Sequence, residues 1–517
     1  MTTQNLECEL KAAVSPETLA RVREACLACS TGEAPTARPK EVYSIYFDTK
    51  DRRLARAGLS LRLRAKGKSW QQTLKSGRVA RSGLNAVEET EQIRSEPTPD
   101  LEGVHAPDGC AVLDIIGRKR LHPLFETRVA RTAVPLTLST GTVECCFDQG
   151  TLIAGDRQAP LCEIEIELVS GSVRAVYEAG IQLLGGAPAR FDLASKADRG
   201  HALADDRARA KPLAFRTSRI PAGQRGGAID VIEHALGYYA DALATNLHLT
   251  LTSPDPEGPH QLRVTVRRLE ALLWLMRGVI RRETYREIKS LGRALRQAVA
   301  LLRDADVLID EILPAAMDAA DQADMAADLS AWREGLRSEV RRALQASKST
   351  AQVLTLLKTA RFADWRPIKA DASQAVLLPF RQVAAPRLQA QWQRLTADGL
   401  SVSSREMFDR HDLRKALKRF RYAGELIHQN DMSSGDQASS TAFLQAIKTL
   451  QTKLGRLNDL DVIAARVPVD LPAKSGALIE ARLEAYRQSK TSAAKRWLKE
   501  ADTLWADAKD LPWPWPT

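Results

Sequence analysis

The side chains with the clearest chemical potential are carboxylates and cations that alternate with apolar residues in short segments. The segment NLECELK, residues 5–11, places Glu7, Glu9 and Lys11 at every second position. Successive side chains of a β-strand point to opposite faces, so this spacing predicts a strand with one charged and one apolar face. The segment CEIEIEL, residues 162–168, repeats the pattern with Glu163, Glu165 and Glu167. Grouped carboxylates are ligands for hard divalent cations, which indicates a site for Mg²⁺ or Mn²⁺.

Cations follow the same alternation elsewhere. The segment SLRLRAK, residues 60–66, aligns Arg62, Arg64 and Lys66. On any single strand these charges would simply be solvated on an open sheet. For the whole set a closed barrel with its charges inside is favoured, because like charges at two-residue spacing repel unless something neutralises them. Such a lumen would hold divalent metal on its acids and a polyanion on its bases. Further members of the set are Lys75, Glu89, Glu91 and Arg131.

The elements that must position these charges are short strands interrupted by glycine and proline. Many short strands in one domain favour a sandwich or a barrel. Helical segments are predicted near 16–29 and 172–185. The predicted strands are 5–14, 43–48, 59–66, 70–75, 86–94, 125–134, 142–148 and 161–169.

These segments resemble the CYTH domain family, the triphosphate tunnel metalloenzymes. ECELK fits the Glu-x-Glu-x-Lys signature of that family, and the remaining motifs follow in the family's order: YFDT, LRLR, TLK, the Glu89/Glu91 pair, FDQG, CEIEIEL and SKADRG. The resemblance covers residues 1–200. It implies an eight-stranded antiparallel barrel around a charged tunnel. It also implies hydrolysis of inorganic triphosphate or thiamine triphosphate, or, as in a few members, adenylate cyclase activity.

The resemblance also implies roles for individual residues. Glu89 and Glu91 would hold a second metal or orient water, and with Lys11 they are the expected catalytic residues. One departure is Val87, where the family often has a basic residue. The expected metal ligands are Glu7, Glu9, Glu163, Glu165, Asp148 and Glu167. The expected phosphate cradle comprises Lys11, Arg62, Arg64, Lys75, Arg131 and Lys196. Arg128 and His201 are expected at the surface, and Arg199 either there or in the lumen.

The remainder of the chain reads as long amphipathic helices rich in leucine, alanine and arginine. The motif HQLRVTVRR at 260–268 matches HDLRKALKR at 411–419, and LLRDADVL at 301–308 matches RLNDLDVI at 456–463. The order and spacing of the motifs predict two similar helical units. The predicted helices are 229–248, 259–281, 284–313, 324–347, 408–429, 440–465 and 474–507.

The repeated motifs resemble the two halves of the CHAD domain, a helical module described as binding polyphosphate. Side chains at i, i+3 and i+7 share one helix stripe. Two facing stripes would form a basic trough for a linear polyanion, although Arg-rich stripes are also common as solvated faces. No motif for stacking or groove reading of nucleic acid is recognised. The expected polyphosphate-binding residues are His260, Arg263, Arg267, His411, Arg414, Lys418 and Arg421.

The charge distribution is consistent with this division. Residues 1–200 carry 27 basic and 26 acidic side chains, whereas residues 201–517 carry 48 and 38. A basic domain attracts polyanions. The seven cysteines all lie at or before Cys162, which indicates a reducing, cytoplasmic setting without a disulfide framework. No secretory signal and no membrane-spanning apolar run is recognised.

The resulting expectation is an α+β multidomain chain. An eight-stranded antiparallel β-barrel with flanking helices at 1–204 is joined by a linker, 205–227, to an all-α domain of two repeated helical bundles, 228–510, with a tail at 511–517. The resemblances imply a Mg²⁺- or Mn²⁺-dependent inorganic triphosphatase that binds inorganic polyphosphate, with polyphosphate granules as a possible location. The alternatives are a polyphosphate- or granule-binding protein with a weak or inactive barrel, and a thiamine triphosphatase or adenylate cyclase.

Overall fold

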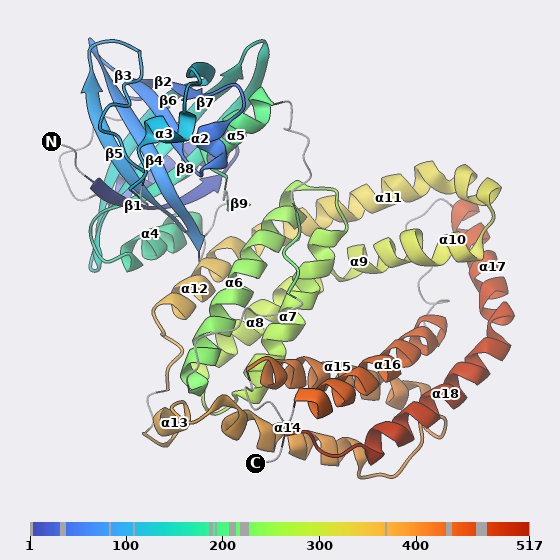
Figure 1. Cartoon of the computed structure of the whole chain (residues 1–517). Coiled ribbons are helices and arrows are strands. Elements are labelled where there is room, and N and C mark those ends of the chain that lie inside the picture. The colour runs from blue at the N-terminus through green and yellow to red at the C-terminus, as the bar shows by residue number, and fades with distance from the viewer. Residues whose placement is uncertain are drawn as a thin grey trace. The chain divides into compact units, whose positions relative to one another are not determined.

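Figure 1 shows the computed structural model of the chain. The described residues are 4–30, 38–81, 84–106, 109–185, 190–191, 194–205, 213–217, 227–367, 370–430, 437–461 and 473–515. The side chains of Glu7 and Val87, and most of the expected linker, lie outside this description. The chain divides into two compact units, Met1–Leu213 with Gln345–Lys358, and Ala214–Leu344 with Thr359–Thr517.

The first unit contains a barrel of antiparallel strands. Among the described residues, eight strands pair in the order β5-β4-β3-β2-β6-β7-β8-β1, and the β1–β5 pairing closes the ring. A two-residue strand, β9 (Arg190–Phe191), adds to β1. The prediction of an eight-stranded antiparallel barrel is confirmed. The eight strands are β1 (Gln4–Ala13), β2 (Lys40–Asp48), β3 (Ser60–Lys66), β4 (Ser69–Arg81), β5 (Leu84–Arg94), β6 (His122–Leu138), β7 (Gly141–Ala154) and β8 (Arg157–Gly171).

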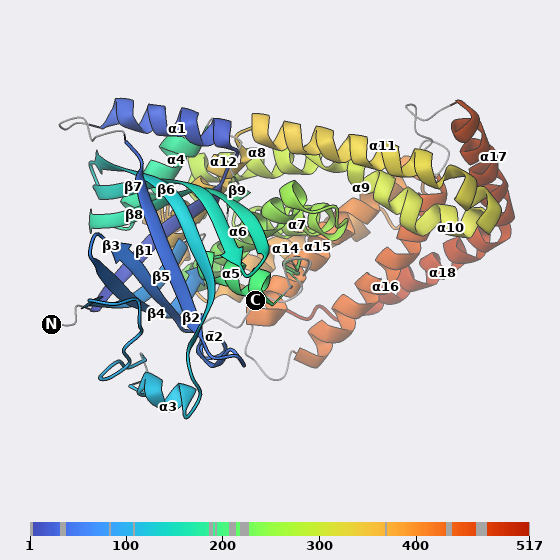
Figure 2. The same ribbon diagram turned by 90° about the horizontal axis from the view of Figure 1, so that it is seen from above.

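Helices cover the apolar outside of the barrel, which leaves the charged faces inside. Helix α1 (Pro16–Cys29) packs against β6, β7 and β8, and against α4 (Arg174–Leu184), as Figure 2 shows. Leu10 of β1 is 1% exposed and packs so close to Gly180 of α4 that an added Cβ would lie 2.7 Å from it. Glu9 and Lys11 flank Leu10, so the two-residue period sends both charges to the interior.

Smaller helices complete this unit: α2 (Arg53–Arg56), α3 (Val112–Ile116) and α5 (Lys196–Ala204). A segment from far along the chain also belongs to it, because Gln345–Lys358 clusters with the barrel. Leu354 in this segment is fully buried and reaches the surface of Gly180, and Lys358 lies 3.9 Å from Glu178. A fragment that stops before residue 345 would therefore expose apolar surface of the barrel unit.

The described residues from 227 to 510 are mainly helical, and all of them except Gln345–Lys358 belong to the second unit. Helix α7 packs on α6 and α8, α15 packs on α14 and α16, and α7 also contacts α15. The two HxLR motifs therefore lie on helices in direct contact. The helices of this part of the chain are α6 (Ala228–Thr252), α7 (Glu257–Leu275), α8 (Arg282–Ala298), α9 (Ala300–Val307), η1 (Leu308–Ile312, a π-helix), α10 (Leu313–Ala316), α11 (Ala319–Ala346), α12 (Ser349–Arg361), α13 (Ala370–Ala375), α14 (Phe380–Thr396), α15 (Met407–Asn430), α16 (Gln437–Asp461), α17 (Ala473–Ser489) and α18 (Thr491–Asp510).

Some predicted helix boundaries are wrong. The helix expected at 284–313 breaks at Val299 and passes through the π-helical turn, and the one expected at 474–507 breaks at Lys490. Helices α12 to α14 were not predicted. Pro386 lies inside α14, and because proline normally interrupts a helix interior the local sequence gives only a weak helix signal there. In the described part of the chain, no helix combines the length and apolarity needed to cross a membrane.

Candidate functional site

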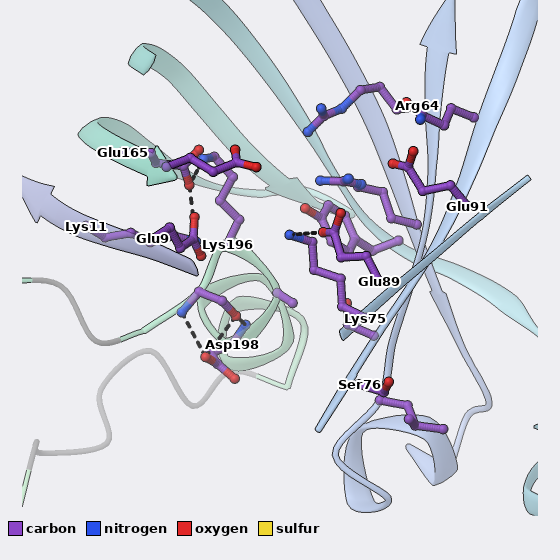
Figure 3. A pocket seen from close by; sticks show the side chains of 18 of the residues that line it. Glu9, Lys11, Arg64, Lys75, Ser76, Glu89, Glu91, Glu165, Lys196 and Asp198 are labelled. Carbon is purple, nitrogen blue, oxygen red and sulfur yellow. Dashed lines mark hydrogen bonds and ion pairs between the residues drawn. The ribbon is translucent and has the colours of Figure 1, made fainter. Parts of the chain in front are cut away.

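The barrel encloses a cavity of about 460 Å³ lined mainly by charged side chains. In Figure 3 Glu9, Lys11, Glu165 and Lys196 form one group, and Arg64, Lys75, Glu89 and Glu91 form another across the space. The strands supply these groups through their inward-facing positions, while α5 contributes Lys196 at its first turn. Ser195 caps α5 in a capping box with Asp198, which fixes the start of the helix beside the cavity.

Three guanidinium groups, those of Arg62, Arg64 and Arg131, lie close together in the cavity. Arg62 donates to Thr73 (3.3 Å), and Arg64 donates to Ser44 (3.4 Å). The proximity of Arg62, together with burial and Arg131, lowers the pKa of Arg64 to about 10. Crowded cations of this kind favour an anion that bridges them, and guanidinium groups match phosphate oxygens in a forked geometry.

Asp148, Glu163 and Glu165 form a buried carboxylate cluster. Their oxygens lie within 4.8 Å of one another, the separation expected for metal ligands. Cations already occupy this cluster. Arg131 binds both oxygens of Asp148 (2.7 and 2.6 Å) and also Glu165 (2.6 Å). Lys196 lies 2.8 Å from Asp148 and from Glu165 and also contacts Glu163.

The pKa values of Glu165 and Lys196 show that these ion pairs outweigh the cost of burial. Burial alone would raise the pKa of Glu165, but Lys196, Lys11 and Arg131 outweigh it and hold the pKa well below its ordinary value. Burial would likewise lower the pKa of Lys196, whereas Asp148, Glu163 and Glu165 raise it. Asp148 and Glu165 are therefore held in the ionised form, and Lys196 and Arg131 neutralise their charges.

A second carboxylate row crosses three neighbouring strands. The strand register places Glu9 of β1 opposite Glu167 of β8, and Glu167 opposite Glu144 of β7. All three side chains line the cavity. Lys11 contacts Glu9 at 2.9 Å and Glu165 at 3.1 Å. Like charges directly opposite on adjacent strands are destabilising, so this row attracts a cation.

The structure brings most of the expected barrel residues together. Asp148 and Glu163 are fully buried but lie outside the cavity lining, and the Arg128 side chain is 63% exposed, as expected. Arg199 contacts Glu163. The expected residues that line the cavity are Glu9, Lys11, Arg62, Arg64, Lys75, Glu89, Glu91, Arg131, Glu165, Glu167 and Lys196.

Other lining residues were not predicted. Glu144 shares the two-residue period of Asp148 on β7, and this signal was present in the sequence. Tyr46 and Ser76 also line the cavity. The prediction of a surface position for His201 is wrong, because α5 turns this side chain toward the cavity and burial lowers its pKa.

The expected polyphosphate residues lie on α7 and α15 in the second unit. We call His260, Arg263, Arg267, Arg414 and Lys418 the basic cluster. Burial, followed by the charges of Arg414 and Arg267, lowers the pKa of Lys418 to about 7. Cations from both repeats are thus close enough to repel one another.

Polar contacts fix several of these side chains. Arg263 donates to the Ala300 carbonyl (3.3 Å) and lies 3.6 Å from Asp304. His411 bonds to Asn458. Arg421 donates to Gln451 (3.0 Å) and pairs with Glu425. In the first repeat these contacts link α7 to α9, which carries the LLRDADVL motif. In the second repeat they link α15 to α16, which carries most of the RLNDLDVI motif.

A closed barrel with a charged interior, joined to a helical unit with paired basic helices, defines the domain class. Residues 5–200 match the CYTH domain model and residues 234–468 match the CHAD domain model. The chain therefore carries a CYTH domain followed by a CHAD domain.

Individual relatives match parts of the chain. It is 32% identical over 162 residues to an inorganic triphosphatase of Haemophilus influenzae, a match that spans 31% of this chain and 44% of that protein. A crystal structure of the CHAD domain from Ricinus communis is similar at 25% identity over 56% of this chain and 96% of its own length, with a TM-score of 0.43. A putative adenylyl cyclase from Hippeastrum, described as having a dominant triphosphatase activity, is similar at 19% identity over 38% and 95%, with a TM-score of 0.29.

Proposed function

We propose that the barrel hydrolyses inorganic triphosphate to diphosphate and phosphate with the help of a divalent metal ion. The observation that carries this proposal is the presence of crowded arginines and a row of carboxylates in one cavity. Arg62 and Arg131 lie close enough to Arg64 to lower its pKa, and Glu9, Glu144 and Glu167 line the same cavity. Hydrolysis of a triphosphate needs cations that position the phosphates and carboxylates that hold a metal ion, because phosphoryl transfer depends on positioning and on neutralisation of negative charge. The relative from Haemophilus influenzae, which the chain matches over less than half its length, is an inorganic triphosphatase.

The residues present fit a hard divalent cation. Glu9, Glu144 and Glu167 offer carboxylate oxygens, which Mg²⁺ and Mn²⁺ prefer. Asp148, Glu163 and Glu165 fit less well, because Arg131 and Lys196 already bind their oxygens. Lys11 binds Glu9 at 2.9 Å, whereas Arg131 and Lys196 together bind all three members of the buried cluster. We assign the metal to the Glu9 row and a charge-fixing role to the buried cluster. When bound, the ion would neutralise phosphate oxygens and polarise the phosphorus centre.

The chain's own residues bind and orient the substrate. Arg62, Arg64 and Arg131 would clamp phosphate oxygens, and the network around Asp148 and Glu165 keeps Arg131 in place. Lys75, which contacts Glu89, would hold the next phosphate. Glu89 and Glu91 lie on the same strand face and would accept hydrogen bonds from the attacking water. Water adds to the terminal phosphorus, and the P–O bond to diphosphate breaks.

The helical unit would bind inorganic polyphosphate at the basic cluster. Cations from α7 and α15 crowd there, as the lowered pKa of Lys418 indicates. A linear polyanion relieves this repulsion by placing successive phosphates between the cations, with release of its counterions. Within this proposal the barrel supplies the chemistry and the helices hold the longer chain.

The test is phosphate release from triphosphate, thiamine triphosphate, ATP and long polyphosphate, each with Mg²⁺ or Mn²⁺. We expect triphosphate to be preferred and hydrolysis to stop without metal. Glu9→Gln should lower the rate about a thousandfold, because a bound metal supplies several kcal/mol to the transition state. The matched control is Glu102→Gln at an exposed site. A folded Glu9→Gln protein with near wild-type turnover would refute the assignment.

A further inference from the structure

A second cavity, of about 320 Å³, lies where α7 ends against α14 in the helical unit. Arginine is its most frequent lining residue, and no carboxylate lines it. The cavity therefore shares no lining residue with the barrel cavity or the basic cluster, and unlike the barrel cavity it has no carboxylate in its lining. Its lining residues are Trp274, Arg277, Arg387, Ala390, Gln391 and Arg394.

Arg387 has a structural role in this cavity, because its guanidinium is already bound to backbone carbonyls. Its Nη1 donates to the carbonyl oxygens of Trp274 (2.9 Å) and Arg277 (2.8 Å), which lie at and just beyond the end of α7. Helix carbonyls at a C-terminus lack partners within the helix, so an arginine from another helix caps them well. This contact fixes the backbone of Trp274 and Arg277 relative to α14, and the cavity is preformed.

The cavity carries positive charge that nothing nearby neutralises. Arg277 and Arg394 are exposed, and neither side chain has a carboxylate partner among the described residues. Arg387 is bound to the Arg277 carbonyl, and burial and the charge of Arg277 lower the pKa of Arg387, although Tyr285 opposes this shift. Such a site favours an anion with several oxygens.

The cavity is also lined by the indole ring of Trp274, with which an inorganic phosphate has no ring to stack. The guanidinium carbon of Arg419 lies 5.1 Å from the centroid of the Trp274 ring, a cation–π contact that orients the ring. Aromatic rings beside arginines bind nucleobases by stacking and phosphates by charge. The ligand expected here therefore carries both an aromatic ring and a phosphate.

The size of the cavity further restricts the class of ligand that can bind. Its volume lies at the lower end of the range for small-molecule pockets. A single-stranded nucleic acid would use successive aromatic platforms, whereas Trp274 is the one aromatic residue that lines this cavity in the described part of the chain. We propose that the helical unit binds a nucleoside monophosphate, with its base on Trp274 and its phosphate on Arg277 and Arg394.

Calorimetric titration of the full chain with AMP, adenosine and ribose 5-phosphate tests the two halves of the ligand. AMP should bind more tightly than either fragment. Trp274→Leu should weaken AMP about tenfold and leave ribose 5-phosphate unchanged, because only the base stacks. Trp274→Phe should restore most of the loss. Equal affinity of wild type for AMP and ribose 5-phosphate would overturn the proposal.

The double variant Arg277→Ala/Arg394→Ala tests the phosphate site. It should weaken AMP more than tenfold, since each charge-assisted hydrogen bond contributes about that factor. The matched control, Arg342→Ala/Arg361→Ala, removes two exposed arginines from α11 and α12. Equal losses from the two pairs, or AMP binding abolished by Arg64→Ala in the barrel, would overturn the site. An oligonucleotide that binds far more tightly than AMP at the same residues would overturn the choice of a mononucleotide.

Discussion

The barrel and the basic cluster hold similar cations in different ways. In the barrel, Lys11, Arg131 and Lys196 each contact carboxylates at 3.1 Å or less. In the cluster, Arg267 and Arg414 lie near Lys418 and lower its pKa to about 7. The buried network of the barrel pairs each of these cations with carboxylates, whereas Lys418 lies among other cations and only Asp459 is named as opposing their effect on its pKa.

The difference in charge pairing follows from the difference in burial between the two regions, and it indicates which kind of binding each region favours. Lys196 and Glu163 are nearly or fully buried, and a buried charge without a partner is costly. The paired network can therefore hold a fixed arrangement of ligands, as a catalytic cavity requires. The half-buried cluster tolerates repulsion because water partly screens it. A bound polyanion would relieve this repulsion beyond what Asp304 and Asp459 do, and this would suit the proposed reversible binding.

The largest expected effect separates the two carboxylate sets of the barrel. Glu163→Gln should lower the free energy of unfolding of the barrel by about 3–5 kcal/mol, because it leaves Lys196 and Arg199 with less compensation in a buried site. Glu167→Gln should weaken metal binding with a much smaller loss of stability. Denaturant titration and metal calorimetry of both variants measure this difference.

Glu102→Gln is the matched control for both variants, because its exposed side chain should change stability by no more than about 0.5 kcal/mol. If Glu163→Gln instead abolished metal binding at unchanged stability, the buried cluster would be the metal site. The compensation argument would then fail.

The charged faces of the barrel could be predicted because strand alternation has a period of two and the family motifs fall on it. The period places Glu9 with Lys11 and Glu163 with Glu165 without any knowledge of the fold. It cannot tell which carboxylates are neutralised. That depends on Lys196, which reaches Asp148 from α5, 48 residues away in the chain. Only the three-dimensional packing shows this contact.

The helical unit was less predictable. The repeated HxLR motifs predicted that two similar helices lie together, and α7 and α15 are in contact. The packing of Gln345–Lys358 in the barrel unit left no signal in the local pattern. The cavity at Trp274 also escaped prediction. Its walls come from α7 and α14, which are more than 100 residues apart, and Pro386 obscured the second helix.

An intermediate effect is expected for the basic cluster. Arg263→Ala/Arg414→Ala should lower polyphosphate affinity about a hundredfold, since each charge-assisted contact contributes at least about 1.5 kcal/mol. The loss should shrink as salt rises, because counterion release drives the binding. Affinity measured at two salt concentrations checks this. The control pair, Arg361→Ala/Lys495→Ala, lies on exposed helix positions. Equal losses in both pairs would mean that general basic charge binds the chain.

The smallest expected effect is a pH dependence that only the crowded region should show. Burial and the neighbouring Arg414, Arg267 and Arg421 lower the pKa of Lys418 to about 7, although Asp459 opposes this shift. A bound polyanion favours the charged form and raises the pKa again. By linkage, binding is strongest below the pKa of the free protein and weakens as pH rises through it.

Polyphosphate affinity should therefore fall about fivefold between pH 6.5 and pH 8, because Lys418 loses its proton over that interval and one phosphate contact with it. Lys418→Arg should remove most of this dependence, since an arginine stays charged throughout. His260→Gln should retain more of it than Lys418→Arg does, because burial and Arg303 lower the pKa of His260 and so favour its neutral form. Affinity measurements at constant ionic strength test these expectations. If Lys418→Arg kept the full pH dependence, the crowding of Lys418 would have no part in binding, and the contrast with the compensated barrel would lose its functional meaning.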